Sequence, residues 1–263
     1  MLKQERESEI VRLLSQSDSG VLSVAQLSRL LSVSEMTIRR DLETLANQGL
    51  VKRIHGGAVH VNSALLFERS FAERGRESRQ AKVAIGRTAA GMVHDGQVII
   101  LDAGTTTLEV ARHLAARRVT AVTNALPVAS ELSAHTEVSA ILLGGEVKGP
   151  ELCTVGPMVT ESLSRMSADL LFLSTAGFSP DRGLTEPDLR EAEVKRAMMR
   201  VAKRVCLVAD SSKYGAVYFA QTAPITSIHA VVTDEQLSAN QRSALEAAGI
   251  EVIIASPASP SPG

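Results

Sequence analysis

The sequence of 263 residues has only two cysteines and no surplus of positive charge. Cys153 and Cys206 lie far apart, without a CxxC pair or a nearby histidine, so the sequence predicts neither a zinc site nor a disulfide framework. Both are expected to be small core residues. Lys and Arg number 28 against 29 Asp and Glu, which gives a net charge of -1 and no overall basic field. Any binding of phosphate must therefore be local.

Long apolar runs are also missing. No stretch reaches about 18 uninterrupted apolar residues, and the first residues alternate charged and apolar side chains, unlike a secretion signal. We therefore expect a soluble, cytoplasmic protein without a membrane partner. The length exceeds that of a typical single domain and predicts two.

The first 57 residues have apolar residues at a spacing near 3.6, which predicts three short helices. The second helix begins with capping-box spacing at Ser23 and Gln26, and Leu27, Leu30 and Leu31 form its expected buried face. Ser34 is a plausible cap for the third helix, with Ser32 and Glu35 as a competing start. Gly49 ends that helix, and LVKRIHGGAVHV then predicts a β-hairpin. We expect a DNA-binding domain at 1–58 and a linker at 59–80.

The third helix presents two different faces. If Ile38 marks its core face, Leu42 and Leu45 lie beside it and Arg40 lies almost opposite. Two helices, a tight turn and a second helix with Thr and Arg near its start predict a recognition helix for the major groove. A three-helix module for protein contact, with a solvated basic face, is the alternative. The predicted DNA-contacting residues on this helix and the hairpin are Ser34, Met36, Thr37, Arg39, Arg40, Lys52, Arg53, His55, Gly56 and Gly57.

The third helix also contains two acidic residues, Asp41 and Glu43. Asp41 lies close to the core face and next to Arg39, so we expect it to hold an arginine or cap local amides. Glu43 is expected to be exposed on the groove side, where it either accepts from cytosine or repels wrongly placed phosphate.

Residues 81–255 alternate apolar runs with helical patterns, from QVIILDA to IEVIIA. Runs that are almost wholly apolar are typical of parallel strands buried on both faces, so this part predicts a doubly wound, mostly parallel α/β sheet. The Pro- and Ser-rich end, residues 256–263, is predicted to be a disordered tail.

The stretch LDAGTTTLEVARHL predicts an anion site. A strand ends at Asp102, Gly104 permits a tight turn, and threonines lead into a helix whose free amides favour a negative charge. It is neither a Walker loop nor a dinucleotide fingerprint. An ordinary capped turn is nearly as compatible with these residues.

Other polar strand ends are expected at the same edge of the sheet, where ligands of open α/β proteins bind. Asp210 and Lys213 could bind a sugar hydroxyl and a phosphate, or form an exposed turn with a surface ion pair. The predicted effector-binding residues are Asp102, Gly104, Thr105, Thr106, Thr107, Asn124, Gly145, Gly177, Asp210 and Lys213. The helix EAEVKRAMMRVAKR carries apolar residues at helical spacing beside a basic face, so we expect it to pack on the sheet. Its basic residues are then expected in solvent, with a second nucleic-acid surface as the alternative: Lys195, Arg196, Arg200, Lys203 and Arg204.

The string SEMTIRRDLETLANQGLVKRIHGGA resembles the signature of the DeoR family of bacterial transcription regulators. The resemblance implies a winged helix-turn-helix, with TIRRDL on the recognition helix and HGGA on the wing. It also implies an effector domain related to ribose-5-phosphate isomerase that senses phosphorylated sugars or similar metabolites. AGTTT matches the phosphate loop of that fold, TNA the second loop and DSSK the Asp and Lys turn.

One departure from the isomerases bears on catalysis. They carry an Asp-rich fourth loop for proton transfer, whereas this chain has STAGFSPDRGLT, with no acid until Asp181 and then Glu186. Enediol chemistry needs a base over the reacting carbon, so we expect binding without turnover, no catalytic residues, no cofactor and no metal. A metabolite-controlled repressor acting as a homodimer or larger is therefore the predicted function. An isomerase with an appended DNA-binding unit and an interaction adaptor are the alternatives.

Overall fold

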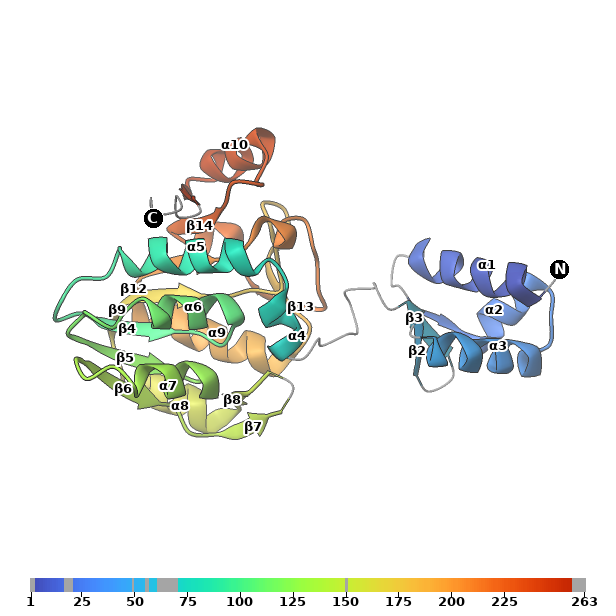
Figure 1. Cartoon of the computed structure of the whole chain (residues 1–263), viewed down its shortest axis with the longest axis horizontal. Coiled ribbons are helices and arrows are strands. Elements are labelled where there is room, and N and C mark those ends of the chain that lie inside the picture. Colours follow the sequence, from blue (N-terminus) through green and yellow to red (C-terminus); the bar gives the residue numbers. More distant parts are fainter. Residues whose placement is uncertain are drawn as a thin grey trace, which may run out of the picture. The chain divides into compact units, whose positions relative to one another are not determined.

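The computed structural model describes residues 3–16, 21–48, 50–54, 57–60, 71–149 and 151–256. The chain divides into two compact units, Met1–Phe67 and Glu68–Gly263 (Figure 1). Among the described residues, no helix has both the length and the apolar character that a membrane span requires.

The first unit combines three helices with a small antiparallel sheet. Its elements in chain order are α1 (Lys3–Gln16), β1 (Val21–Ser23), α2 (Val24–Leu31), α3 (Glu35–Asn47), β2 (Val51–Ile54) and β3 (Gly57–His60). The sheet order is β1-β3-β2, so β3 is the central strand. The predicted helices and hairpin are present, and β1 is a third strand that the sequence did not reveal because it has only three residues.

The helix starts follow from side-chain caps. Ser23 and Gln26 form the predicted capping box of α2. Ser34 caps α3, since its side chain accepts a hydrogen bond from the backbone N–H of Thr37 at 3.2 Å. Ser32 instead ends α2 in a left-handed conformation with φ 52°, which excludes the competing start of α3.

The core of this unit gathers one apolar stripe from each helix. Ile10, Leu27, Ile38 and Leu42 are completely buried in it. Leu30 was expected on the buried face, but it is 59% exposed. The prediction was wrong because α2 is short, and its contacts with α3 and β1 cover only the side that carries Val24 and Leu27.

The second unit is a larger α/β fold. Its helices in chain order are α4 (Phe71–Arg76), α5 (Arg79–Ala90), α6 (Thr105–Arg112), α7 (Leu126–Leu132), α8 (Pro157–Ser164), α9 (Leu189–Val201) and α10 (Ala239–Ala247), with short 3-10 turns η1 (Ser211–Lys213) and η2 (Ile225–Ser227). The main-sheet strands are β4 (Val98–Leu101), β5 (Val119–Thr123), β6 (Val138–Leu142), β9 (Ala168–Leu173), β12 (Ala202–Val208), β14 (Ala230–Asp234) and β15 (Glu251–Ala255). The remaining strands are β7 (Glu146–Lys148), β8 (Cys153–Val155), β10 (Gly177–Ser179), β11 (Gly183–Glu186) and β13 (Ala220–Ala223).

The seven main strands form one parallel sheet in the order β15-β14-β12-β9-β4-β5-β6. The chain starts in the middle at β4, runs to the β6 edge, and returns through β9 to the other edge. The reversal lies between β4 and β9, where doubly wound folds place their ligands. The predicted fold class is confirmed.

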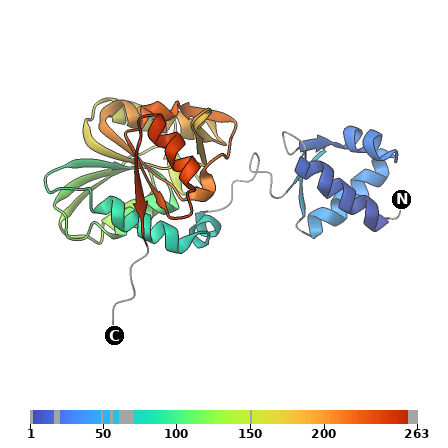
Figure 2. The same ribbon diagram turned by 90° about the horizontal axis from the view of Figure 1, so that it is seen from above.

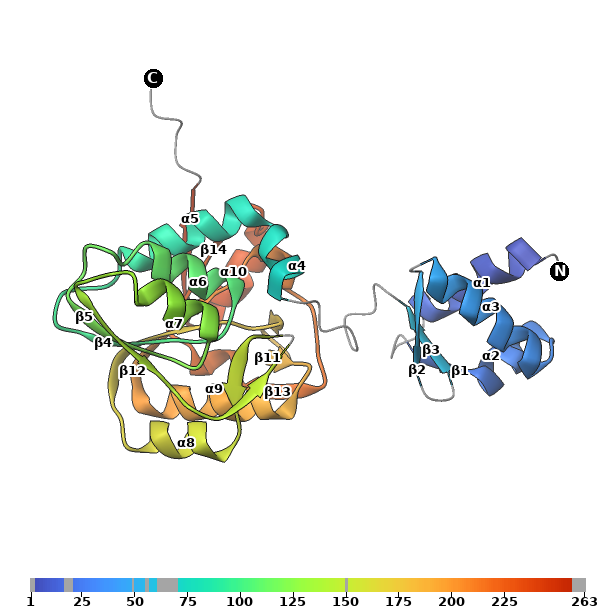
Figure 3. The same ribbon diagram turned by 60° about the horizontal axis from the view of Figure 1, so that its bottom comes forward.

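Helices cover both faces of this sheet (Figure 3). Residues of α5, α6 and α7 pack on one face with Ile99 and Leu101, whereas residues of α8, α9 and α10 pack on the other with Ile100. This alternation follows from the two-residue period of a strand. Figure 2 shows α10 and β15, both in red, side by side. Cys153 and Cys206 are both buried, as predicted.

Two details differ from the predictions. The apolar run at β6 was expected to be buried on both faces, but Ser139 to Leu142 are exposed because β6 is the edge strand of the sheet. The stretch 59–80 was expected as a linker that runs into a helix, and α5 is such a helix. The short helix α4 was not expected, and its Arg74 pairs with Glu151 of the second unit.

Candidate DNA-binding surface and effector site

The recognition helix α3 has one buried face and one exposed face. Ile38, Leu42 and Leu45 are at most 2% exposed, as predicted. Met36 is 62% exposed, and Arg39, Arg40 and Glu43 are exposed with it. Arg39 lies 3.4 Å from Glu35, and none of the described residues forms an ion pair with Arg40. The exposed face can thus offer a guanidinium to DNA without first breaking a contact.

Asp41 anchors this helix from the inside. It is 2% exposed and accepts two hydrogen bonds from Arg6 of α1, at 2.6 Å from Nε and 3.1 Å from Nη2. The expectation that Asp41 holds an arginine is confirmed, with Arg6 as the partner. The neighbouring Arg39 cannot reach it, since two helical positions turn a side chain by about 200°.

The predicted contact residues on the hairpin are placed only in part. Lys52 and Arg53 lie on β2, but their side chains are outside the described part of the structure, as are His55 and Gly56. Gly57 begins β3 opposite Ser23 of β1. A side chain on Gly57 would meet the carbonyl oxygen of Leu22 at 2.5 Å, so this glycine is required by the strand pairing within the unit.

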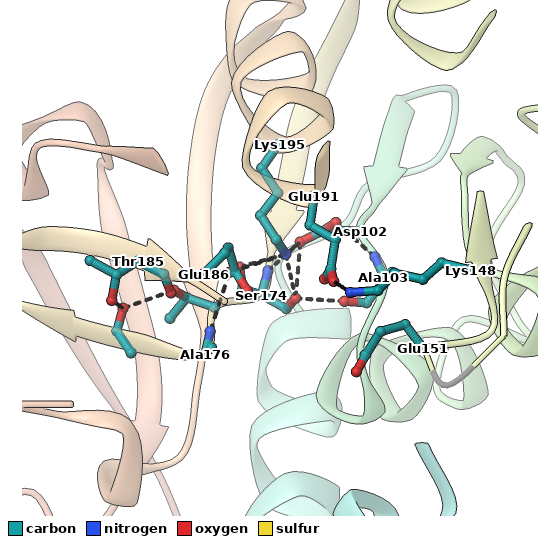
Figure 4. A network of polar contacts seen from close by, with 12 residues as sticks. Asp102, Ala103, Lys148, Glu151, Ser174, Ala176, Thr185, Glu186, Glu191 and Lys195 are labelled. Atoms are coloured by element: carbon teal, nitrogen blue, oxygen red, sulfur yellow. Dashed lines mark hydrogen bonds and ion pairs between the residues drawn. The ribbon is translucent and has the colours of Figure 1, made fainter. Parts of the chain in front are cut away.

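The second site lies at the reversal point of the large sheet, where Asp102 follows β4 and Ser174 follows β9. Asp102 Oδ2 accepts hydrogen bonds from the backbone N–H of Ser174 at 3.0 Å and from its hydroxyl at 2.9 Å (Figure 4). The other oxygen, Oδ1, accepts from the N–H of Ala103 at 2.8 Å. Asp102 was predicted to bind the effector, but its carboxylate is 1% exposed and fixes the two strand ends to each other.

Lys195 of α9 completes this junction. Its Nζ lies 2.5 Å from Asp102 Oδ2, 3.0 Å from Ser174 Oγ and 3.5 Å from Glu186 Oε1 (Figure 4). The expectation that Lys195 is solvated was wrong, because it is only 3% exposed. Lys195 stands four residues after the buried Glu191 and three before the buried Met198, so it lies on the buried face of α9.

The charges in this junction shift one another's pKa values. Burial raises the pKa of Glu186 from 4.5 to about 7, although Lys195 opposes the shift. Burial alone would lower the pKa of Lys195, but Asp102, Glu186 and Glu191 raise it above its usual value. Lys195 therefore stays charged, while Glu186 titrates near neutral pH.

A second buried lysine continues the network. Lys148 of β7 pairs with Glu191 and lies 3.2 Å from Asp188, the cap of α9. Burial disfavours the charge of Asp188, but Arg190 and Lys148 prevail and lower its pKa to about 2. The network thus joins β4, β7, β9, β11 and α9 at one end of the sheet.

The threonine loop is closed to solvent. Gly104 precedes α6, and Thr105, Thr106 and Thr107 are 8%, 6% and 0% exposed. The hydroxyl of Thr107 donates to the carbonyl oxygen of Gly104 at 2.9 Å. A side chain on Gly104 would come within 3.0 Å of Ser174 Cβ, so glycine permits the close contact between the two strand ends.

Lys82 of α5 is a buried cation that sequence reasoning missed. It is 5% exposed, and its Nζ donates to the backbone carbonyl oxygen of Arg74 in α4. Burial lowers the pKa of Lys82, with Asp210 opposing and Lys213 contributing to the shift. No sequence motif marks this lysine, because its burial depends on α4.

The other predicted effector residues also follow the carboxyl ends of strands. Asn124 is buried and donates to the carbonyl oxygen of Thr154 at 2.9 Å, while its Oδ1 has no partner among the described residues. Gly145 and Gly177 are each needed for a close backbone approach, to Val155 and Ala216 respectively. Asp210 is buried and accepts from the Ser212 hydroxyl. The suggested ion pair between Asp210 and Lys213 is not formed in the described part of the chain.

This arrangement suits the binding of a small anion with hydroxyl groups. The first turn of α6 offers backbone amides, and Lys82 and Lys213 supply positive charge close to Asp210. Within the described ranges, no cluster of His, Cys, Asp and Glu has a geometry that could hold a metal ion.

Two family models cover most of the chain. The DeoR-like helix-turn-helix domain matches residues 6–64, and the DeoR C-terminal sensor domain matches residues 77–235. The solved ribose 5-phosphate isomerase A of Methanocaldococcus jannaschii is 16% identical, with a TM-score of 0.38, over 51% of this chain and 53% of that chain.

Curated relatives match along nearly the whole length. The HTH-type transcriptional regulator GlpR of Haloferax volcanii is 40% identical and covers 96% of this chain and 98% of the relative. The transcriptional repressor AccR of Agrobacterium fabrum is 38% identical, covering 88% and 89%, and the HTH-type transcriptional repressor CsqR of Escherichia coli is 32% identical, covering 95% and 94%. The chain therefore belongs to the DeoR family of transcriptional regulators.

Proposed function

We propose that this regulator is a sequence-specific repressor of carbohydrate metabolism genes whose binding to DNA is controlled by a phosphorylated sugar or a related metabolite. The observation that carries the first part is the exposed face of α3, where Met36 and Arg40 lie opposite the completely buried Ile38 and Arg39 lies on the flank. Relatives that are themselves named transcriptional repressors support repression rather than activation of the target genes. We place this regulator in the cytoplasm.

On DNA, α3 enters the major groove and Arg40 reads base edges, with guanine as its expected partner. Ser34, Thr37 and Arg39 contact the backbone nearby. Lys52, Arg53, His55 and Gly56 of the hairpin act as the wing, on the phosphate backbone or in an adjacent groove. One such unit contacts few bases, so the repressor acts as a homodimer or a larger homo-oligomer on paired half-sites.

In the second unit, the phosphate of the effector binds at the first turn of α6, to the amides of Thr105 to Thr107, with Lys82 and Lys213 as its cations. Asn124 and Asp210 face the hydroxyl groups. Asn124 supports this assignment because its Oδ1 is buried without a partner among the described residues, and a sugar hydroxyl can donate to it.

This site binds its ligand without turning it over. Proton transfer between sugar carbons needs a free base above the reacting carbon. The carboxylate of Glu186 instead accepts from the N–H of Ala176 at 3.2 Å and lies 3.5 Å from Lys195, and Asp181 is exposed.

A gel-shift assay on the DNA upstream of the protein's own gene, with a panel of phosphorylated sugars, tests partner, ligand and sign of control together. We expect sequence-selective binding at moderate salt that one class of sugar phosphate alters by about 5- to 150-fold. Lack of sequence-selective binding would contradict the DNA-binding role. Solvent deuterium entering the sugar phosphate at an enzymatic rate would contradict binding without turnover.

Variants test the effector residues separately. Thr106→Val and Lys213→Ala should keep DNA binding and lose the response to the sugar phosphate. Their matched controls are Thr160→Val, in the first turn of α8 on the opposite face, and Lys203→Ala, an exposed lysine paired with Asp169. An unaltered response in both test variants would show that the pocket is elsewhere.

A further inference from the structure

We propose that α4 is a latch over the proposed effector site, and that an anion bound there releases α4. The inference rests on the proposed function, because it concerns access to the threonine loop and Lys82. It adds the physical step by which the ligand acts on the rest of the chain.

Contacts with α6, α5 and the turn after β7 hold α4 in place. The position of a side chain on Gly75 lies 3.8 Å from Thr105 Cγ2, so α4 packs directly on the first turn of α6. The guanidinium of Arg74 pairs with Glu151, from the turn between β7 and β8. The ammonium of Lys82 donates to the carbonyl oxygen of Arg74. The latch therefore contacts the threonine loop, and Lys82 is one of the polar groups that hold it.

The helix itself contributes little to staying docked. It has six residues, none of which is buried, and an isolated helix of this length is unstable in water. Two of the contacts that hold it are made by Arg74, so the loss of either one weakens the docking of α4. Segments with few buried contacts are the ones that open most readily.

Lys82 is the anchor on which a ligand can compete. Its ammonium is buried, and among the described residues no carboxylate lies within 4.0 Å of it. A neutral carbonyl oxygen compensates a buried charge less well than an anion does, because charge-assisted hydrogen bonds are stronger. An anion bound at the threonine loop would therefore replace the carbonyl oxygen of Arg74 as the hydrogen-bond acceptor of Lys82.

The position of α4 in the chain links this exchange to DNA binding. Residues 61–70 are all that separate β3 of the first unit from α4. Release of α4 adds its six residues to that connection. A longer connection lowers the effective concentration of one DNA-binding unit near its counterpart in the oligomer, and so weakens binding to paired half-sites.

Hydrogen–deuterium exchange of the full chain tests the latch, with inorganic phosphate as the probe and chloride at equal ionic strength as its control. We expect phosphate to speed amide exchange in residues 71–76. Glu151→Gln should speed that exchange in the absence of phosphate. It should also tighten phosphate binding about fivefold, because α4 is docked over the site in a smaller fraction of the molecules. The matched control is Glu146→Gln, which removes an ion pair with Arg190 from the same hairpin and should change neither measurement.

A second pair of variants approaches the latch through packing. Gly75→Leu places a large side chain against Thr105 and should undock α4, with the same effects as Glu151→Gln. Gly75→Ala adds a methyl group at an ordinary contact distance and should leave α4 docked.

The outcomes separate the latch from the proposed function. If phosphate binding depends on Thr106 but leaves exchange in residues 71–76 unchanged, or if Glu151→Gln and Gly75→Leu bind phosphate no more tightly than their controls, the latch is wrong and the effector site stands. If neither phosphate nor any sugar phosphate binds in a way that depends on Thr106 and Lys213, the proposed effector site is wrong and the latch with it.

Discussion

The two units of this protein use charge in opposite ways. In the first, Arg39, Arg40 and Glu43 project into solvent from a helix whose apolar face is buried. The buried Asp41 is paired with the partly buried Arg6. In the second, Lys82, Lys148 and Lys195 are all at most 7% exposed, and they lie near the place where we propose that the effector binds. A surface that meets DNA keeps its charges hydrated until binding, whereas a pocket for a small ligand is built from charges that are already desolvated.

This difference decides how each unit can be damaged. Removing an exposed charge affects the partner and leaves the fold intact, because exposed ion pairs contribute little to stability. Removing one member of a buried network leaves the other charges buried and unpaired, which destabilises the fold. In the first unit, a substitution at the binding surface should therefore change binding without changing stability. In the second unit, a substitution at the binding site should change both.

Lys195→Met should have the largest effect on stability. It leaves Asp102 and Glu186 buried without their cation, so we expect a loss of about 3 to 5 kcal/mol in the free energy of unfolding. Urea unfolding followed by circular dichroism measures it. The control Lys203→Met removes an exposed lysine that is paired with Asp169 and should leave the free energy of unfolding nearly unchanged. Equal losses in the two variants would contradict the buried network.

Titration of Glu186 should make the second unit less stable as pH rises. Its pKa is raised in the folded protein to about 7, so the stability associated with its protonated form is complete below about pH 4.5 and is lost as pH rises through 7. Glu186→Gln removes this dependence. We expect the variant to equal the wild type near pH 5 and to exceed it by about 2 to 3 kcal/mol at pH 8. Parallel stability curves for the two proteins from pH 5 to 8 would contradict the assignment.

The fold was largely predictable from the sequence, because it depends on local periodicity. The buried stripe of Ile38, Leu42 and Leu45, the capping box at Ser23 and the apolar runs of the parallel strands each appear as a spacing of residue types. The exceptions have physical causes. Strand β1 is too short to show a pattern, and the apolar run of β6 looks like a central strand although it lies at an edge.

The candidate effector site was predictable only where a strand end meets a helix start. Asp102 and the threonines were found from their position, but the internal role of Asp102 was not, since it depends on Lys195 from a helix 93 residues later. Lys195 was assigned to solvent because it stands among other basic residues in the sequence. Lys82 and Glu151 could not be found, because their importance arises from α4, a short helix within a stretch that reads as a linker.

Arg40→Ala tests the exposed charge of the first unit. We expect it to weaken DNA binding by about 1 to 3 kcal/mol and to relax specificity, while stability and the response to sugar phosphate stay unchanged. Arg12→Ala, which removes an exposed arginine of α1 paired with Glu9, is the control and should have no effect on DNA affinity. Gel shifts at several salt concentrations measure both. Unchanged DNA affinity in Arg40→Ala would exclude it from the recognition surface.

The smallest expected effect compares one chemical change in both units. Ser34 caps α3, and Ser238 caps α10 in the same way, each accepting from the backbone N–H three residues later. Either serine changed to alanine should reduce stability by about 1 kcal/mol, because one amide of the first turn loses its acceptor. Only Ser34→Ala should also weaken DNA binding, since its loss frays the turn that carries Thr37 and displaces the residues beside Arg40. The two variants are compared at equal loss of stability. If both of them lose DNA affinity, or if neither does, α3 has no special role in reading DNA. The contrast between the two units would then be wrong.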